Sequence, residues 1–244
     1  MSGHSKWHNI QQRKGKQDAA KSNVFSKLSK QIMIVVKQGG GDPAANFSLR
    51  LLMDKARVAG MPKDNIERAI KKATGAGADG AQMEEVLYEA YGAGGAAVLI
   101  KAITDNKNRT TADIKHIVSQ CGGNFASAGS VQWMFEQCGL VIISNEQIAN
   151  SKVSRDDLEM KMMDAGADDI WEEDGLVYFK VKLTDFKKAM DVVKGMNLEV
   201  EKAGVEWVAK DKVKVEGVNE AQLKRLFGEL EENDDVEDYY TNAE

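Results

Sequence analysis

The sequence predicts an α+β protein, with an N-terminal three-helix bundle and two α/β domains, one of them ferredoxin-like and inserted into the other. Three observations predict this architecture. Apolar residues recur with a helical period up to residue 75, and past the linker at 75–80 short apolar strands alternate with helices. Between residues 140 and 208 these elements follow the order β-α-β-β-α-β, which is that of a split βαβ fold.

The first part of the chain is predicted to be an unordered basic arm. Trp7 and Ile10 are its only large apolar residues, so the arm cannot bury enough surface to order itself. Two interpretations of Trp7 remain: it stacks on a nucleobase or fills a groove of a partner, or it docks on the protein's own surface. The predicted parts are residues 1–20 (arm), 21–75 (bundle), 81–136 with 209–235 (split α/β domain) and 137–208 (inserted domain).

Three amphipathic stretches predict the bundle. In the first, residues 18–38, apolar side chains from Val24 to Val36 form one stripe, and lysines lie roughly opposite. We expect that lysine face to meet either solvent or phosphate. Asp42–Pro43 is predicted to begin the second helix, and Pro62 the third, which ends at Gly75.

The remaining elements follow from changes in period. The split domain is predicted to hold strands at 86–91, 96–104 and 131–136, a helix that ends near Cys121, and a flexible loop at 122–130. The inserted domain is predicted to hold strands at 140–144, 170–172, 176–183 and 200–208, and helices at 155–165 and 184–196. A helix at 219–231 follows. The acidic residues 229–238 are expected to form a solvated, frayed tail, or alternatively to fold back onto the basic arm.

Charge is divided unevenly along the chain. The 244 residues contain 33 Lys and Arg against 38 Asp and Glu, a formal net charge of −5. Residues 1–75 hold 15 basic and 5 acidic side chains, a net of +10, so residues 76–244 hold 18 and 33, a net of −15. This asymmetry indicates a basic module that meets an anion, although solvated lysines on helices are the alternative.

Several functional classes find no support in the sequence. Apolar runs such as Ala96–Ile100 are far shorter than the roughly 18 residues of a membrane span. The polar, basic N-terminus lacks an apolar stretch, so we do not expect secretion by a signal peptide. Two cysteines and three histidines match no zinc or catalytic pattern. The segment Gly92–Gly95 lacks the Lys-Ser/Thr of a phosphate-binding loop. We therefore expect a cytoplasmic protein that is not an enzyme, with no metal, cofactor, membrane or small-molecule substrate; its oligomeric state stays open.

The polar loop 105–111 is a second candidate contact. It joins a buried strand to a helix and brings amides, cations and hydroxyls together in seven residues. It has two interpretations: it caps the helix in a turn, or it contacts phosphate or RNA.

Three motifs resemble the YebC/PmpR family. They are Gly3-His4-Ser5-Lys6-Trp7 with Ile10 and Arg13-Lys14, then Tyr88–Gly95 continued by Thr104–Thr110, and finally Gly129–Phe135. Ala90 and Ala93 are mild departures from glycine and proline. The resemblance implies a cytoplasmic three-domain protein of a family described as probable DNA-binding transcriptional regulators. It also implies an alternative, because relatives in mitochondria and bacteria resemble translation factors that act at the ribosome on difficult nascent chains.

The sequence therefore predicts a non-enzymatic, nucleic-acid-binding regulator of the YebC type, with a factor that binds ribosomal RNA as the alternative. No helix-turn-helix, zinc-finger or RNA-recognition signature is visible, which weakens sequence-specific DNA readout and favours structured RNA. Phosphate contacts position a protein without reading sequence. The predicted contact residues are His4, Lys6, Trp7, Arg13, Lys14, Lys16, Lys21, Lys27, Lys30, Asn106, Lys107 and Arg109.

Overall fold

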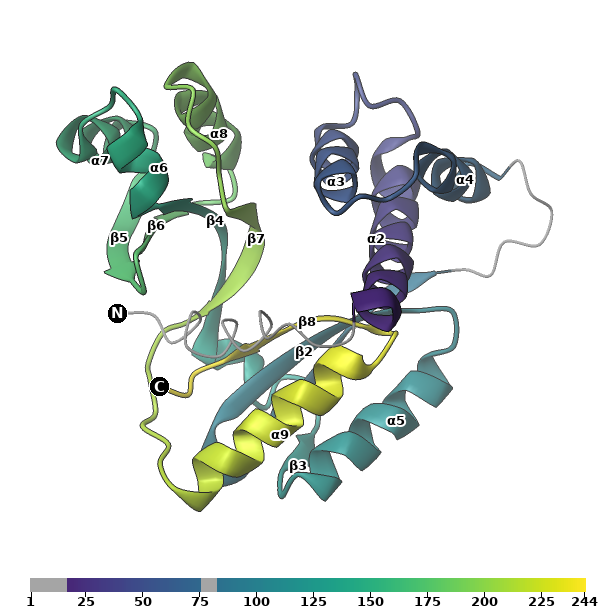
Figure 1. Cartoon of the computed structure of the whole chain (residues 1–244). Helices are drawn as coiled ribbons and strands as arrows, with labels where there is room; N and C mark the ends of the chain where they lie inside the picture. The colour runs from purple at the N-terminus through teal and green to yellow at the C-terminus, as the bar shows by residue number, and fades with distance from the viewer. Residues whose placement is uncertain (1–16, 76–82) are drawn as a thin grey trace. The chain divides into compact units, whose positions relative to one another are not determined.

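The computed structural model describes residues 17–75 and 83–244, which form two compact units (Figure 1). One unit contains the described residues up to Val131 together with Glu216–Tyr239. The other contains Gln132–Val215 and Tyr240–Glu244. The predicted α+β class is confirmed, with a helical bundle and two four-stranded sheets in the described part of the chain. None of the helices in these segments has the length and apolar character of a membrane span.

The predicted bundle has three helices. They are α2 (Gln17–Gly39), α3 (Phe47–Val58) and α4 (Lys63–Ala73). Their apolar stripes meet in a core that includes Ile32, Leu49 and Ile66, each at most 3% exposed. Burial of such side chains stabilises the bundle by about 1.5–3 kcal/mol each.

The prediction that Asp42–Pro43 begins the second helix is wrong. The Asp42 carboxylate caps an earlier turn, because it accepts a hydrogen bond from the Ala44 amide at 2.9 Å. Asn46 is the N-cap of α3: its Oδ1 accepts from the Leu49 amide at 3.0 Å, and its Nδ2 donates to the Val35 carbonyl at 2.9 Å. Asn46 thereby ties the start of α3 to the end of α2.

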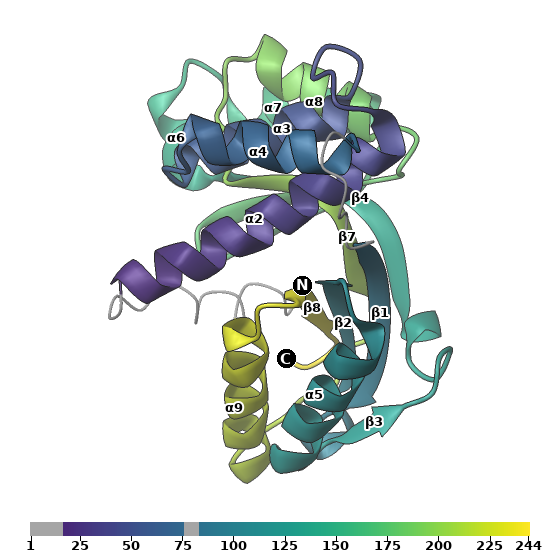
Figure 2. The same ribbon diagram turned by 90° about the vertical axis from the view of Figure 1, so that its right-hand side faces the viewer.

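The first sheet has the strand order β3-β1-β2-β8. Its strands are β1 (Glu84–Tyr91), β2 (Ala97–Thr104), β3 (Asn124–Ala126) and β8 (Val236–Thr241). Helices α5 (Lys107–Gln120) and α9 (Val218–Glu232) lie side by side against one face of this sheet (Figures 1 and 2). As predicted for a strand with near-continuous apolar residues, all side chains but Lys101 in β2 are buried.

Residues 122–130 do not form the flexible loop that the sequence predicts. Strand β3 lies within them and pairs with β1, so that Asn124 lies opposite Tyr91. The buried Glu89 carboxylate, 3% exposed, accepts hydrogen bonds from the Gly129 amide at 2.5 Å and the Val131 amide at 2.6 Å. Glu89 therefore fixes the backbone of this loop.

The prediction of a frayed acidic tail is also wrong. Residues 229–238 complete α9 and enter strand β8, where Val236 and Tyr239 are buried. The Tyr239 ring stacks on Phe227 with a centroid distance of 4.5 Å and an interplanar angle of 5°. These aromatic and branched side chains form strand β8 despite the acidic residues between them.

The inserted unit contains the predicted ferredoxin-like domain. In chain order its elements are β4 (Phe135–Ser144), α6 (Asn145–Asn150), α7 (Arg155–Asp164), β5 (Ala167–Glu173), β6 (Leu176–Val181), α8 (Phe186–Gly195) and β7 (Lys202–Ala209). The strand order β5-β6-β4-β7 places the first and third strands at the centre, as in a split βαβ fold. The hairpin between β5 and β6 turns at Asp174 and Gly175, with φ angles of 50° and 77°.

Separate strands at 131–136 and 140–144 are not found. A short 3-10 turn at Gln132–Met134 precedes one continuous strand, β4, which passes through Gly139. A Cβ atom at Gly139 would lie 2.7 Å from Cδ2 of Phe186. This glycine therefore permits close packing of α8 on the sheet and does not break the strand.

Candidate nucleic-acid interface

The predicted contact residues lie in three parts of the chain. Those of the arm fall outside the described residues: His4, Lys6, Trp7, Arg13, Lys14 and Lys16. Lys21 lies near the start of α2. Lys27 and Lys30 follow it on α2, and Asn106, Lys107 and Arg109 lie at the start of α5.

Lys27 and Lys30 form hydrogen bonds inside the protein. Lys27 Nζ donates to the Glu231 carbonyl at 2.8 Å. Lys30 Nζ donates to the Asp234 carbonyl at 2.8 Å and to Asp235 Oδ1 at 2.7 Å. Both lysines therefore contact one short acidic segment, Glu231–Asp235, at the end of α9, which we call the acidic corner.

The acidic corner provides a favourable site for these cations. The last carbonyls of a helix lack intrahelical partners and carry the negative end of the helix dipole. Asn23 adds to this contact, because its Nδ2 donates to the Glu232 carbonyl at 3.4 Å. Burial lowers the pKa of Lys27, and the nearby Glu231 and Asp234 carboxylates only partly compensate.

The Asp235 carboxylate accepts from three elements: α2, α5 and the end of β2, where Thr104 Oγ1 donates to Oδ2 at 3.4 Å. Besides Lys30, its carboxylate accepts hydrogen bonds through Oδ2 from Arg109 Nη2 at 2.9 Å and from Thr110 Oγ1 at 2.7 Å. Burial opposes ionisation of this carboxyl, but the hydrogen bonds from Lys30, Thr110 and Arg109 outweigh it and lower its pKa to about 2. Asp235 is therefore an ionised anchor between α2 and α5.

The polar loop before α5 is a helix cap. Asn106 is the N-cap residue, and its Oδ1 accepts a hydrogen bond from the Arg109 amide at 3.1 Å. The Arg109 guanidinium also contacts the Asp105 carboxylate at 3.0 Å. Asn106 and Arg109 thus have structural roles, whereas Lys107 presents an exposed side chain at the helix start.

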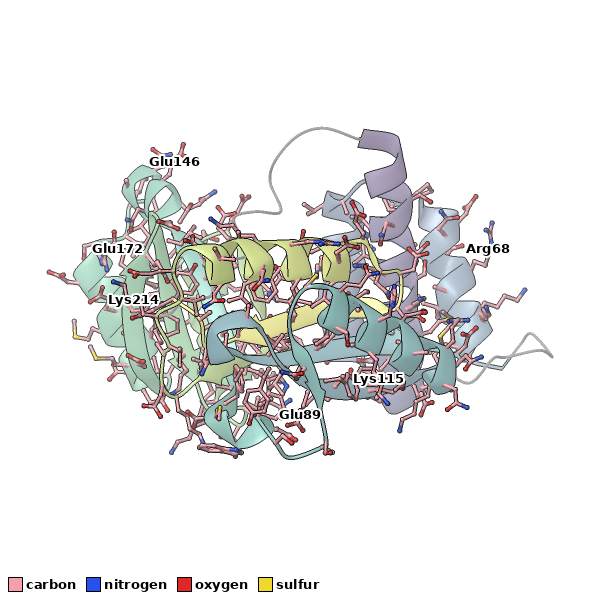
Figure 3. All side chains as sticks on the ribbon, turned by 90° about the horizontal axis from the view of Figure 1, so that it is seen from below. Arg68, Glu89, Lys115, Glu146, Glu172 and Lys214 are labelled. Atoms are coloured by element: carbon pink, nitrogen blue, oxygen red, sulfur yellow. The ribbon has the colours of Figure 1, made fainter. Side chains whose placement is uncertain are left out.

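The structure adds exposed cations that the sequence reasoning missed. Lys55 on α3 and Arg68, Lys71 and Lys72 on α4 are exposed. Figure 3 shows Arg68 extending away from the bundle. The ion pairs on these helices, Arg57–Asp54 and Lys63–Glu67, involve other residues. The sequence pattern of α4 predicts this exposure, because a helical period places Arg68, Lys71 and Lys72 opposite the buried Ile66 and Ala69.

Residues with other potential chemistry are dispersed. His116 lies exposed on α5, and Cys121 and Cys138 are buried free thiols. Burial raises the pKa of Cys138 to about 12, which makes the reactive thiolate scarce. In residues 17–75 and 83–244 no group of His, Cys, Asp or Glu side chains has an arrangement that could hold a metal ion.

Comparison with known proteins covers nearly the whole chain. A family model described as the TACO1/YebC protein N-terminal domain matches residues 5–76, and one for the TACO1/YebC second and third domain matches residues 83–243. The chain belongs to the TACO1/YebC family. Its resemblance to YebC proteins, expected from the three motifs, is confirmed.

Relatives of this TACO1/YebC chain share its full length. One from Pseudothermotoga lettingae is 41% identical over 244 residues, covering 100% of this chain and 94% of the relative. One from Thermosipho africanus is 44% identical over 246 residues, with the same coverage of both chains. Both are named "probable transcriptional regulatory protein". The crystal structure of a conserved hypothetical protein from Aquifex aeolicus superposes with a TM-score of 0.87 at 34% identity, covering 98% of this chain and 97% of that one.

Proposed function

We propose that this TACO1/YebC protein is a non-enzymatic transcriptional regulator of the cytoplasm that binds nucleic acid through its N-terminal basic module. The observation that carries the proposal is the set of exposed cations on α3 and α4: Lys55, Arg68, Lys71 and Lys72. The names of the full-length relatives support the regulatory role.

Electrostatics favour this end of the molecule as the contact surface. Residues 1–75 carry a net charge of +10 and the remainder −15. A phosphate backbone attracts the first part and repels the second, so it orients the protein during encounter. We expect the acidic α/β domains to face protein or solvent.

The proposed interface combines two sets of residues. The bundle cations supply contacts from rigid helices, and Lys107 adds a charge at the start of α5. The arm supplies His4 and Trp7 together with the cations Lys6, Arg13, Lys14 and Lys16, and Lys21 follows near the start of α2. Trp7 offers a ring on which a base can stack. Because phosphate contacts carry no sequence information, specificity comes from nucleic-acid shape, stacking or a partner.

The test is a charge-removal variant of the full chain. We expect Lys55→Gln/Arg68→Gln/Lys71→Gln/Lys72→Gln to weaken binding to a mixed-sequence duplex DNA. The slope of log affinity against log salt should become shallower by about 3–4, since each phosphate contact contributes about 0.9. The binding is measured by fluorescence anisotropy over a salt series.

The matched control removes the same charge from the inserted domain. Four of its exposed lysines are Lys152, Lys161, Lys182 and Lys187. Their replacement with glutamine should leave the salt slope at the wild-type value. Equal slopes for both quadruple variants would overturn the proposal. A second measurement distinguishes transcription from translation. If the cellular protein co-sediments with ribosomal subunits and crosslinked samples contain no promoter DNA, the protein acts in translation and the proposed role in transcription is wrong.

A further inference from the structure

The internal contacts of α2 have the form of a helix bound to a row of anions. Asn23, Lys27 and Lys30 lie at i, i+4 and i+7, so they share one face of the helix. Their donors reach oxygen atoms of four positions in the acidic corner: Glu231, Glu232, Asp234 and Asp235. Three of these acceptors are backbone carbonyls and one is a carboxylate.

The carboxylate of Asp235 is held as a bound phosphate would be. Lys30, Arg109 and Thr110 converge on it with donor–acceptor distances between 2.7 and 2.9 Å. Two cations and a hydroxyl around one anion are a typical phosphate-binding set. Lys30 and Arg109 are also residues that the sequence suggested as anion contacts from unrelated segments of the chain.

We propose that this face of α2, with Arg109 beside it, is a second nucleic-acid-binding surface that the acidic corner covers in the free protein. The inference rests on the proposed function. In the free protein, the bundle is held to the acidic corner by the hydrogen bonds of α2. A phosphate backbone then competes for Lys27, Lys30 and Arg109. Binding then separates α2 from the corner, and the contact is autoinhibitory.

The contact is well placed for such an exchange. Arg109 is half exposed, with 50% of its side-chain surface accessible, and Lys30 retains 18%. A polyanion can therefore approach the pair from solvent before the internal contact breaks. The acidic corner makes its direct contacts through three carbonyls and one carboxylate, whereas a phosphate backbone offers a full charge at each contact and therefore competes for these cations.

Substitution of the internal anion tests the proposal. Asp235→Asn removes the charge that holds Lys30 and Arg109, and we expect duplex DNA affinity to rise about threefold to tenfold at moderate salt. Adding Lys30→Gln to Asp235→Asn should cancel much of this gain. The control is Asp113→Asn, an exposed aspartate on α5, which should match wild type. Circular dichroism confirms that each variant is folded.

A crosslink provides a test that leaves Asp235 intact. In the variant Asn23→Cys/Glu232→Cys, a short bismaleimide joins α2 to the acidic corner, while the native cysteines remain buried. We expect the crosslinked protein to bind duplex DNA severalfold more weakly than the same variant before crosslinking.

Four results overturn the inference. An unchanged affinity for Asp235→Asn, or for the crosslinked protein, overturns it while leaving the proposed function in place. A gain in Asp235→Asn that persists undiminished when Lys30→Gln is added also overturns it, because the released lysine then makes no phosphate contact. Absence of salt-dependent DNA binding by the wild-type chain overturns both proposals.

Discussion

Replacement of Asp235 with asparagine is expected to lower stability at neutral pH and to leave it unchanged at low pH. The pKa of this carboxyl is lowered to about 2, against an ordinary value of 3.8. The folded state therefore favours the carboxylate, and its contribution is complete above pH 4. As the pH falls from about 4 through about 2, that contribution is lost.

The magnitude follows from the same values. The difference between 3.8 and about 2 corresponds to about 2.4 kcal/mol of unfolding free energy. Asp235 is 7% exposed, but its partner Arg109 is half exposed, and solvent screening there reduces the expected loss to about 1–2 kcal/mol. Urea unfolding followed by far-ultraviolet circular dichroism, repeated at several pH values, measures the difference between Asp235→Asn and wild type.

The comparison of the two proteins isolates this one carboxyl, because the other acidic groups are common to both. We expect the difference in unfolding midpoint to be largest near pH 7 and to shrink toward zero near pH 2. The control Asp113→Asn should show no difference at any pH. A difference for Asp235→Asn that does not change between pH 7 and pH 2 would refute the reasoning.

Three further predictions concern buried groups. Glu89→Gln should destabilise the protein by about 2–4 kcal/mol in urea unfolding, because an amide oxygen cannot accept from both loop amides as strongly as a carboxylate does. As a control, replacement of the exposed Glu84 with glutamine should have little effect on stability. Equal losses of stability for the two variants would contradict the role of Glu89. Gly139→Ala should cost about 1–3 kcal/mol, because the added methyl group meets the Phe186 ring, and unchanged stability would show that α8 adjusts freely. Cys138, with its pKa raised to about 12, should resist alkylation in native protein at neutral pH and react after unfolding, and rapid native labelling would be inconsistent with its burial.

Helical and strand periods made most of the fold predictable. The stripe from Val24 to Val36 and the ordered series after residue 140 specify the bundle and the ferredoxin-like domain, because each pattern extends over many residues. Strand β3 has only three residues, and its place depends on pairing with β1 and on the Glu89 contacts. Those partners are about 40 residues away in the chain, so local sequence carries no sign of them.

Strand β8 was missed for a different reason. Acidic residues dominate the composition of 229–238, whereas the buried face of β8 depends on Val236 and Tyr239. Composition alone therefore suggested a solvated tail, although the branched and aromatic residues were present in the same segment.

The positive charge of the candidate site was predictable from the sequence, but the internal partners of its lysines were not. Sequence identified Lys27 and Lys30 as anion contacts, but their partners in the acidic corner are 204 and 205 residues away. Only the folded chain shows that these lysines form hydrogen bonds with the acidic corner. It also shows that other cations, such as Arg68 and Lys71, are exposed to solvent.

The measurement that tests the central claim most directly is the salt dependence of duplex DNA binding by the wild-type chain. Counting only the four arm cations (Lys6, Arg13, Lys14 and Lys16) and the four on α3 and α4 (Lys55, Arg68, Lys71 and Lys72), the proposal predicts eight phosphate contacts. We expect log affinity to fall linearly with log salt with a slope of about −7. A slope near zero, or no binding at low salt, would contradict the claim that this basic module contacts a phosphate backbone.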